Sequence, residues 1–302
     1  MTIAITGGLG FIGTNLIGAL REEFGGDFRI LDNLSNPSGD LEITDDIELI
    51  EGDICDANSV NQLVEGADAV IHLAAHTRVI ESVTDPVLNF KVNTIGTFNV
   101  LEAMRNNSVN IFVGASTGGA ILGEVPPPIN EEIAAKPASP YGASKLAAEG
   151  YCWAYAQSYG IKATSLRFSN IYGPFSRNKA SVVAAFIKNI KEKGAVTVYG
   201  DGSQTRDYLH VDDLTAGIIN AIKNDAVGVY QLGHGKPTSL NELIEIFREV
   251  SLIDFDVIHK DFRSGELIHT YCDISKAHAE FAFSPRVKLV DGVKTTWNWF
   301  DT

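Results

Sequence analysis

The chain has 302 residues, 45% of them hydrophobic, and carries a formal net charge of −14 at pH 7. A chain of this length and composition can bury a large core, which predicts a soluble globular protein of one compact unit or two closely joined domains. The negative charge would repel the phosphates of nucleic acids and of anionic membranes, so neither is an expected partner.

The start of the chain and its cysteines bear on compartment and metal content. A strand-like run begins at Thr2, which leaves no room for a signal peptide, and no uninterrupted apolar stretch is long enough to cross a bilayer. We therefore expect a cytoplasmic protein. Cys55, Cys152 and Cys272 lie far apart without CxxC spacing, so neither a disulfide framework nor a metal site is expected.

Short apolar strands alternate with helices along the first part of the chain. Strands are expected at residues 2–6, 28–32, 47–51, 68–74, 110–116 and 163–168, and helices include residues 11–24 and 87–107. Continuous apolar strands that alternate with helices indicate an α/β fold with a Rossmann-type, doubly wound parallel sheet covered on both faces.

The pattern changes at about residue 171. Shorter strands at 196–200 and 229–233 lie among helices such as 239–250, which predicts a smaller C-terminal α/β lobe. We expect a domain at 1–170 and a second at 171–302, with an interleaved boundary and a shared cleft.

A glycine-rich turn, "TGGLGFIG" at residues 6–13, follows the first strand and opens the first helix. Gly7, Gly10 and Gly13 would let backbone amides at the helix N-terminus face a pyrophosphate, although glycines alone also fit an ordinary tight turn. Asp32 ends the second strand, where its carboxylate can bind an adenosine ribose and would repel the 2′-phosphate of NADP. Together these features predict an NAD site.

The stretch "SPYGASK" at residues 139–145 places a tyrosine and a lysine on one helical face. Ser139 is a suitable N-cap and Pro140 suits the first helical position, so Tyr141 falls in the first turn and Lys145 one turn later. Taken alone, the pair fits an exposed i, i+4 contact. Beside a dinucleotide site, the Lys145 ammonium, the helix N-terminus and a positive nicotinamide ring could stabilise a Tyr141 phenolate that acts as a base.

The chain resembles the extended short-chain dehydrogenase/reductase family, and within it the NAD-dependent nucleotide-sugar epimerases and dehydratases. The motifs that carry the resemblance are "TGGLGFIG", "GDI" at 52–54, "HLAA" at 72–75, "NTIGT" at 93–97, "YGASK", "RFSNIYGP" at 167–174 and "YGDGSQTRDYLHVDD" at 199–213. The likeness is closest to the UDP-glucose 4-epimerases and runs from Thr2 to about Phe281.

The resemblance implies roles for particular residues. Tyr141 would be the catalytic base, and Lys145 would hold the nicotinamide ribose and lower the tyrosine pKa. The residues implied to contact NAD are Gly7, Gly10, Phe11, Ile12, Gly13, Asp32, Asn33, Asp53, Ile54, Ala74, Ala75, Asn93, Tyr141 and Lys145. Those implied to contact the nucleotide sugar are Asn170, Tyr199, Arg206, Arg263, Glu266 and Thr270.

A catalytic hydroxyl is also implied by the resemblance, after the fifth strand. Counting back from Tyr141 gives Ser116, whereas counting back from Gly123 lands beside Thr117, so both stay candidates. The dehydratases carry an acidic pair after this hydroxyl, but here Gly118, Gly119 and Ala120 follow. The resemblance therefore favours epimerisation at C4 of a UDP-hexose through a 4-keto sugar, with NAD regenerated in each cycle.

Two alternatives to a 4-epimerase remain. One is another 4-keto-forming enzyme, such as a 3,5-epimerase, reductase or dehydratase; the other is a dinucleotide sensor without turnover, against which the intact Tyr141 and Lys145 argue. Many relatives form dimers through the tyrosine-bearing helix and the helix before it. Tyr151, Trp153 and Tyr155 could supply such a homodimer contact or belong to the core.

Overall fold

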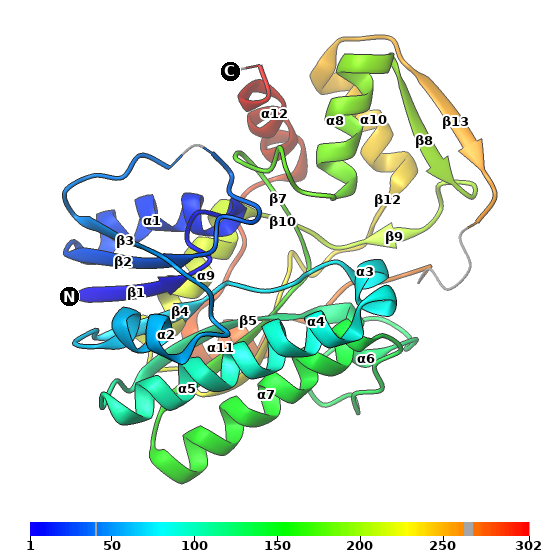
Figure 1. Cartoon of the computed structure of the whole chain (residues 1–302). Helices are drawn as coiled ribbons and strands as arrows, with labels where there is room; N and C mark the ends of the chain where they lie inside the picture. Colours follow the sequence, from blue (N-terminus) through cyan, green and yellow to red (C-terminus); the bar gives the residue numbers. More distant parts are fainter. Residues whose placement is uncertain (40, 263–267, 302) are drawn as a thin grey trace.

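A seven-stranded parallel sheet forms the centre of the molecule, in the strand order β11-β6-β5-β4-β1-β2-β3 (Figure 1). The computed structural model describes residues 1–39, 41–262 and 268–301. The strands are β1 (Thr2–Thr6), β2 (Asp27–Asp32), β3 (Ile47–Glu51), β4 (Ala69–His72), β5 (Ile111–Thr117), β6 (Lys162–Phe168) and β11 (Gly228–Leu232). The order 3-2-1-4-5-6 is that of doubly wound dinucleotide-binding folds, so the predicted α/β fold class is confirmed.

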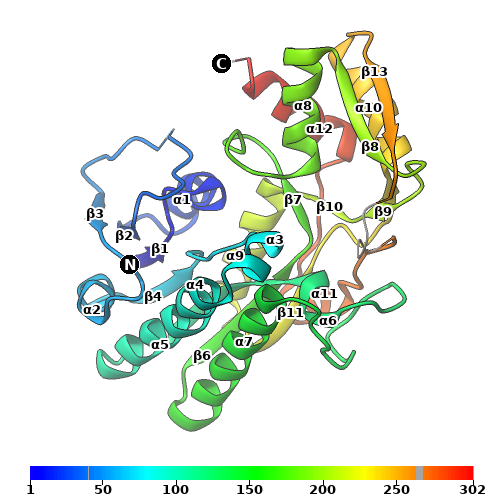
Figure 2. The ribbon, with the colours of Figure 1, turned by 45° about the vertical axis from the view of Figure 1, so that its right-hand side comes forward.

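Helices cover both faces of the sheet (Figure 2). α1 (Phe11–Phe24), α9 (Val211–Lys223) and α11 (Ser275–Phe281) pack on one face, and α2 (Ala57–Val64), α5 (Gly96–Asn106) and α7 (Pro140–Tyr159) pack on the other. Strand β1 shows why both faces are apolar. Ile3 and Ile5 join one core and Ala4 joins the other, because successive strand side chains point to opposite faces.

The helix expected at 87–107 is present but is not one regular α-helix. α4 (Pro86–Phe90) leads into a π-helical turn, η1 (Lys91–Ile95), and α5 continues from it. Such turns are rare and frequently occur at functional sites. Here the π-helical turn carries the buried side chain of Asn93.

The smaller lobe begins where the chain leaves β6, so it stands at the carboxyl ends of the sheet strands (Figure 1). The described part of this lobe contains three strand pairs: β7 (Asn170–Tyr172) with β10 (Tyr208–His210), β8 (Ala195–Tyr199) with β13 (Asp256–Lys260), and β9 (Thr205–Arg206) with β12 (Thr238–Ser239). Its helices are α8 (Val182–Lys193), α10 (Leu240–Ser251) and α12 (Leu289–Trp299). Phe186, Phe247 and Trp297 lie in its own apolar core.

One strand was placed in the wrong lobe by the sequence. The strand expected at 229–233 is β11, which pairs with β6 at the edge of the central sheet. Its Tyr230 and Leu232 are buried against the same core as α1 and α9. The two parts of the molecule are therefore interleaved along the chain. No helix in the described ranges is both long and apolar enough to cross a membrane.

Candidate active site

The glycine-rich turn lies between β1 and α1, where its backbone packs closely against itself and against the loop after β4. Gly7 has a φ of +68°, and a Cβ there would come within 2.7 Å of the Ala74 amide nitrogen. A Cβ at Gly13 would lie 2.4 Å from the Gly8 carbonyl oxygen. Gly10 caps α1 without any side chain, so the amides of the first turn, which starts at Phe11 and Ile12, stay available to an anion. This cradle fits a pyrophosphate.

Asp32 lies at the carboxyl end of β2 and is bonded to the glycine-rich turn. Its Oδ2 accepts a hydrogen bond from the Leu9 amide (3.0 Å), and its Oδ1 accepts one from the Leu34 amide (3.0 Å). A carboxylate has about four acceptor positions, so two remain for ribose hydroxyls. The side chain is placed where a dinucleotide-binding fold needs this acceptor.

Asn33, Asp53 and Ile54 gather at the ends of β2 and β3. The Asn33 amide donates to Asp53 Oδ2 (3.0 Å), and the Cys55 amide donates to Asp53 Oδ1 (2.8 Å). Burial acts to raise the pKa of Asp53, but the hydrogen bonds from Cys55 and Asn33 outweigh it and lower that pKa. The group is therefore a preorganised acceptor beside the buried Ile54 side chain.

The loop after β4 contains Ala74 and Ala75 and is held from two sides. The Ala74 amide donates to Thr6 Oγ1 (3.2 Å). Asn93 accepts from the His76 amide (2.8 Å) and donates to the His76 carbonyl (3.0 Å) and to Ser144 Oγ (3.1 Å). The π-helical turn thereby joins this loop to α7, next to the tyrosine and lysine.

The start of α7 has the predicted capping. Ser139 Oγ accepts a hydrogen bond from the Gly142 amide (3.2 Å), and Pro140 occupies the first helical position. The Tyr141 amide is capped by Ser82 Oγ (3.1 Å), from the short helix α3 (Val79–Thr84). The cap fixes the direction of the helix and places Tyr141 in its first turn.

Tyr141 and Lys145 are both buried, with 8% and 4% of their surface exposed. Burial raises the pKa of Tyr141 to about 12, and a hydrogen bond with the Thr117 side chain only partly offsets this. Burial lowers the pKa of Lys145 to about 8. The protein alone thus disfavours both the phenolate and the ammonium.

The two candidate hydroxyls at the end of β5 have different partners on α7. Ser116 Oγ donates to Glu149 Oε1 (2.6 Å) inside a buried ion pair, whereas the Thr117 side chain is bonded to Tyr141. The short helix α6 (Gly118–Leu122) begins directly after Thr117. Of the two hydroxyls, the one bonded to Tyr141 is therefore that of Thr117.

The smaller lobe brings several predicted sugar-nucleotide contacts together. The Asn170 amide donates to the Asp207 carbonyl (2.9 Å), next to Arg206 on β9. Thr270 is half-buried, and its amide donates to the Thr205 carbonyl (3.1 Å) on the same strand. Tyr199 ends the nearby β8. Arg263 and Glu266 lie outside the described residues.

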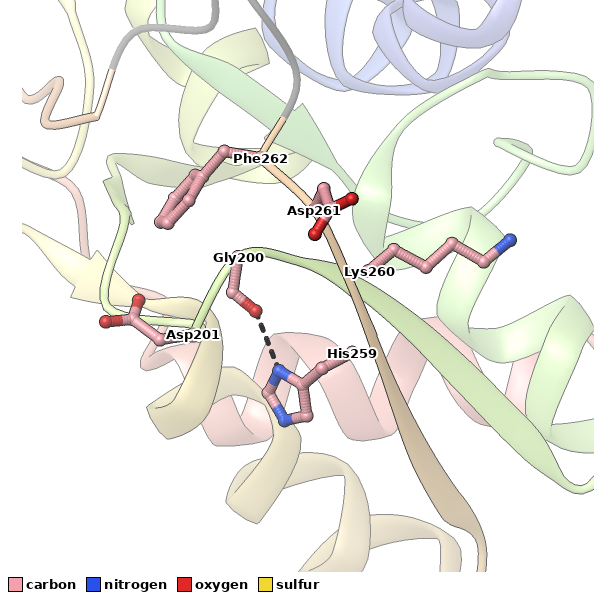
Figure 3. A pocket seen from close by; sticks show the side chains of 6 residues that line it. All are labelled: Gly200, Asp201, His259, Lys260, Asp261 and Phe262. Atoms are coloured by element: carbon pink, nitrogen blue, oxygen red, sulfur yellow. Dashed lines mark hydrogen bonds between the residues drawn. The ribbon is translucent and has the colours of Figure 1, made fainter.

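An open pocket lies beside Tyr199, where β8 and β13 end (Figure 3). The Phe262 ring covers Gly200, whose φ is +87° and where a Cβ would meet the ring at 2.3 Å. His259 donates through Nδ1 to the Gly200 carbonyl (2.7 Å), and Asp201, Lys260 and Asp261 complete the lining. A flat aromatic ring above backbone is suited to stacking with a planar group.

Two charged residues near the site were missed by the sequence reasoning. Glu149 and Arg167 form an ion pair (2.8 Å) in which each side chain is at most 6% exposed. The sequence offered a sign of each residue. Glu149 lies four residues after Lys145, and Arg167 is a charged residue in a strand expected within the central sheet, where a buried charge is almost always paired.

Comparison with known proteins agrees with this geometry. Residues 3–233 match the model of the NAD dependent epimerase/dehydratase family. The chain belongs to this family. It is 36% identical to a putative UDP-glucose 4-epimerase of Methanocaldococcus jannaschii, over 98% of this chain and 97% of that protein. Relatives at 31% identity also include dTDP-glucose 4,6-dehydratases.

Solved structures of the family share the whole fold. The UDP-glucose 4-epimerase of Thermotoga maritima, crystallised with UDP-glucose, superposes with a TM-score of 0.93 at 34% identity and covers 100% of this chain and 99% of that one. The UDP-N-acetylglucosamine 4-epimerase of Methanobrevibacter ruminantium also gives 0.93, at 31% identity, over 99% and 97% of the two chains. The chain is thus an NAD-dependent enzyme of the epimerase/dehydratase family, as expected.

Proposed function

We propose that this enzyme interconverts UDP-hexoses that differ in configuration at C4, through a transient 4-keto sugar. The observation that carries the proposal is the arrangement at the end of β5. Thr117 contacts the buried Tyr141, and Gly118, Gly119 and Ala120 follow it without an acidic side chain. A dehydratase needs a second acid and base to eliminate water, whereas a 4-epimerase needs one proton acceptor that later returns the proton.

Tyr141 is the base in this proposal. Its phenolic oxygen accepts the proton of the sugar 4-hydroxyl, and Thr117 holds the same oxygen by a hydrogen bond. Lys145 binds the nicotinamide ribose and offers a positive charge to the phenolate. NAD, when bound, would supply the acceptor and donor of the hydride at C4. The proton then returns from Tyr141, so that the cycle leaves NAD unchanged.

The cofactor is held by the carboxyl edge of the sheet. The amides at the start of α1 face its pyrophosphate, Asp32 accepts from its adenosine ribose, and Asn33, Asp53 and Ile54 flank the adenine. Asn93 holds the loop of Ala74 and Ala75 through its bond with the His76 amide, and this loop would contact the cofactor. Asn170, Arg206 and Tyr199 face the nucleotide of the sugar from the smaller lobe.

The proposal is tested with a panel of UDP-sugars and dTDP-glucose, followed by NMR of the anomeric protons. We expect a C4-epimer of at least one UDP-hexose to form without added NAD, and acid denaturation of the purified protein to release NAD. Formation of a 4-keto-6-deoxy sugar from dTDP-glucose would instead identify a dehydratase. Steady accumulation of NADH would identify a net dehydrogenase.

We also propose that the enzyme is a homodimer. Apolar side chains are exposed on α3, α4, η1 and α7, which pack against one another: Val79, Ile80, Val83, Val87, Leu88, Phe90, Ile95, Tyr151 and Trp153. Tyr155, in contrast, is 6% exposed and belongs to the core. Many exposed apolar side chains on neighbouring elements are typical of a protein–protein contact.

Sedimentation measurements test the dimer. We expect twice the chain mass of 32.6 kDa for the protein and a monomer for Val87→Asp, because a charge buried at an apolar contact is costly. The matched control is Leu252→Asp, in which an equally apolar side chain, 89% exposed after α10, is changed in the smaller lobe. A monomeric parent protein would refute the dimer.

A further inference from the structure

A buried group of charges lies directly behind Lys145. Lys145 and Glu149 are one turn apart on α7, and both line a small internal cavity with Ser116, Cys152, His72 and Ser165. Arg167 reaches Glu149 from β6. The proposed mechanism uses none of these groups except Lys145.

The Glu149 carboxylate is fully engaged, but not by the nearest lysine. Arg167 donates through Nε to Oε1 (2.9 Å) and through Nη2 to Oε2 (2.8 Å), and Ser116 Oγ adds a third bond to Oε1 (2.6 Å). Lys145 donates instead to the carbonyl of Ala115 (2.9 Å). A lysine and a glutamate four residues apart on a helix ordinarily attract each other, so their separation here needs a cause.

Arg167 supplies that cause. Its planar guanidinium matches both carboxylate oxygens at once, which a lysine ammonium cannot do. A buried carboxylate without a partner is strongly unfavourable, so without Arg167 the Glu149 side chain would take the nearest cation. That cation is Lys145, whose ammonium would then turn away from Tyr141, which lies one turn in the opposite direction.

Among the described residues, no other charged group near Lys145 could draw its ammonium away. Tyr141 and Cys152 on α7 are neutral at pH 7, because burial raises the pKa of both. His72 on β4 is neutral as well, because burial and then Lys145 lower its pKa to about 3. Glu149 is the one described group facing Lys145 that carries negative charge.

We propose that Arg167 is a positioning residue for catalysis, which occupies Glu149 so that the Lys145 ammonium stays at the Ala115 carbonyl, from where it can serve Tyr141 and the nicotinamide ribose. This inference rests on the proposed function for the role of Lys145 in turnover. The placement of Lys145 can also be measured without turnover, through the affinity for NAD.

The test compares Arg167→Met with the double variant Arg167→Met/Glu149→Leu. In the single variant Glu149 captures Lys145, and we expect the NAD affinity and kcat each to fall by about 10- to 100-fold, as when a group that orients a functional side chain is lost. The acidic limb of the kcat–pH profile should move to higher pH, because the Tyr141 phenolate loses a nearby positive charge.

The double variant removes the competitor as well as its partner. Well-packed apolar residues can replace a buried ion pair without loss of stability, so the double variant is expected to fold. The NAD affinity should return to within about 3-fold of the parent value. The acidic limb of the kcat–pH profile should return to within about 0.5 pH units of its position in the parent, since a tenfold effect corresponds to about one pH unit. Isothermal titration of NAD into protein from which the bound cofactor has been removed gives the first quantity, and the epimerisation assay gives the second.

A folded double variant that is as impaired as Arg167→Met would overturn the inference, because it would assign the pair a packing role only. Parent-like NAD affinity in Arg167→Met would overturn it too. If Arg167→Met does not fold, Arg167→Lys replaces it: one carboxylate oxygen becomes free, and a weaker effect of the same sign is expected. If the parent shows no epimerisation, the proposed function fails, while NAD titration still decides the positioning role.

Discussion

Changing Thr117 and Ser116 separately is the sharpest test of the site, because the two hydroxyls are neighbours with different partners. Thr117→Val keeps the shape of a β-branched strand residue and removes only the hydroxyl that contacts Tyr141. Removing one hydrogen-bond donor to a developing oxyanion typically costs about 10²- to 10³-fold in kcat, or about 2.7–4 kcal/mol. We expect a loss of this size, with little change in Tm.

Ser116→Ala should behave in the opposite way. It removes a 2.6 Å bond to the buried Glu149 carboxylate, which keeps both of its bonds from Arg167. A lost bond to a buried charged group costs about 1–3 kcal/mol of folding stability. Tm should fall by several degrees while kcat stays within about tenfold of the parent, since Lys145 and Tyr141 keep their places.

The assay is kcat and kcat/KM for the preferred UDP-hexose, with Tm from calorimetry on the same preparations. Retention of NAD, measured after acid release, shows that each variant still binds its cofactor. Near-normal turnover of Thr117→Val together with a large loss in Ser116→Ala would refute the reasoning and make Ser116 the catalytic hydroxyl.

Three further predictions concern the base, the sugar pocket and a buried histidine. Tyr141→Phe should retain NAD and lose about 10²- to 10⁴-fold in turnover, as expected for loss of a general base, and normal turnover would exclude the tyrosine. The resemblance implies that Thr270, seven residues after Arg263, borders the C2 substituent of the sugar. Thr270→Tyr should therefore lower kcat/KM for UDP-N-acetylglucosamine by about 5- to 150-fold more than for UDP-glucose, because overpacking this part of the pocket costs about 1–3 kcal/mol. Equal losses for the two sugars would show that Thr270 does not limit the size of the C2 substituent. His72 stays neutral in the folded protein, with a pKa of about 3, but binds a proton below about 6.5 when unfolded. The free energy of unfolding should therefore fall as the pH drops from 6.5 to 5, by at most about 1.4 kcal/mol per pH unit. His72→Gln should flatten this part of the stability–pH profile, measured by urea unfolding. An unchanged slope in that variant would mean that His72 is not the group responsible.

The strands and first helices of the sheet could be predicted because burial on both faces leaves a clear apolar pattern. The run at 229–233 shows the limit of that pattern. Its apolar residues predict a strand, but pairing is decided by contacts with residues far along the chain, and β11 joins β6 through Tyr230 and Leu232. The π-helical turn at Lys91–Ile95 has no periodicity of its own in the sequence.

The candidate site was predictable where a motif fixes the local backbone, as at Ser139, Pro140 and Tyr141. Ser116 and Thr117 could not be separated, because counting along the chain is ambiguous when the following turn varies in length. Both hydroxyls have their partner on α7, and only the packing of α7 on β5 brings Thr117 to Tyr141 and Ser116 to Glu149. The role of Arg167 likewise depends on a neighbour 18 residues away along the chain.

The ionisation of Tyr141 links the site to its cofactor. Burial raises the pKa of Tyr141 to about 12, which disfavours its phenolate near pH 7, whereas Lys145, whose pKa burial lowers to about 8, stays mostly protonated at that pH. The phenolate would therefore need a further source of positive potential beside that of Lys145. The oxidised nicotinamide ring carries such a charge and is placed beside the tyrosine in our proposal. Bound oxidised NAD would supply positive potential that favours the Tyr141 phenolate. Our proposal therefore predicts that Tyr141 acts as a base near neutral pH only when both Lys145 and the oxidised cofactor stabilise its phenolate.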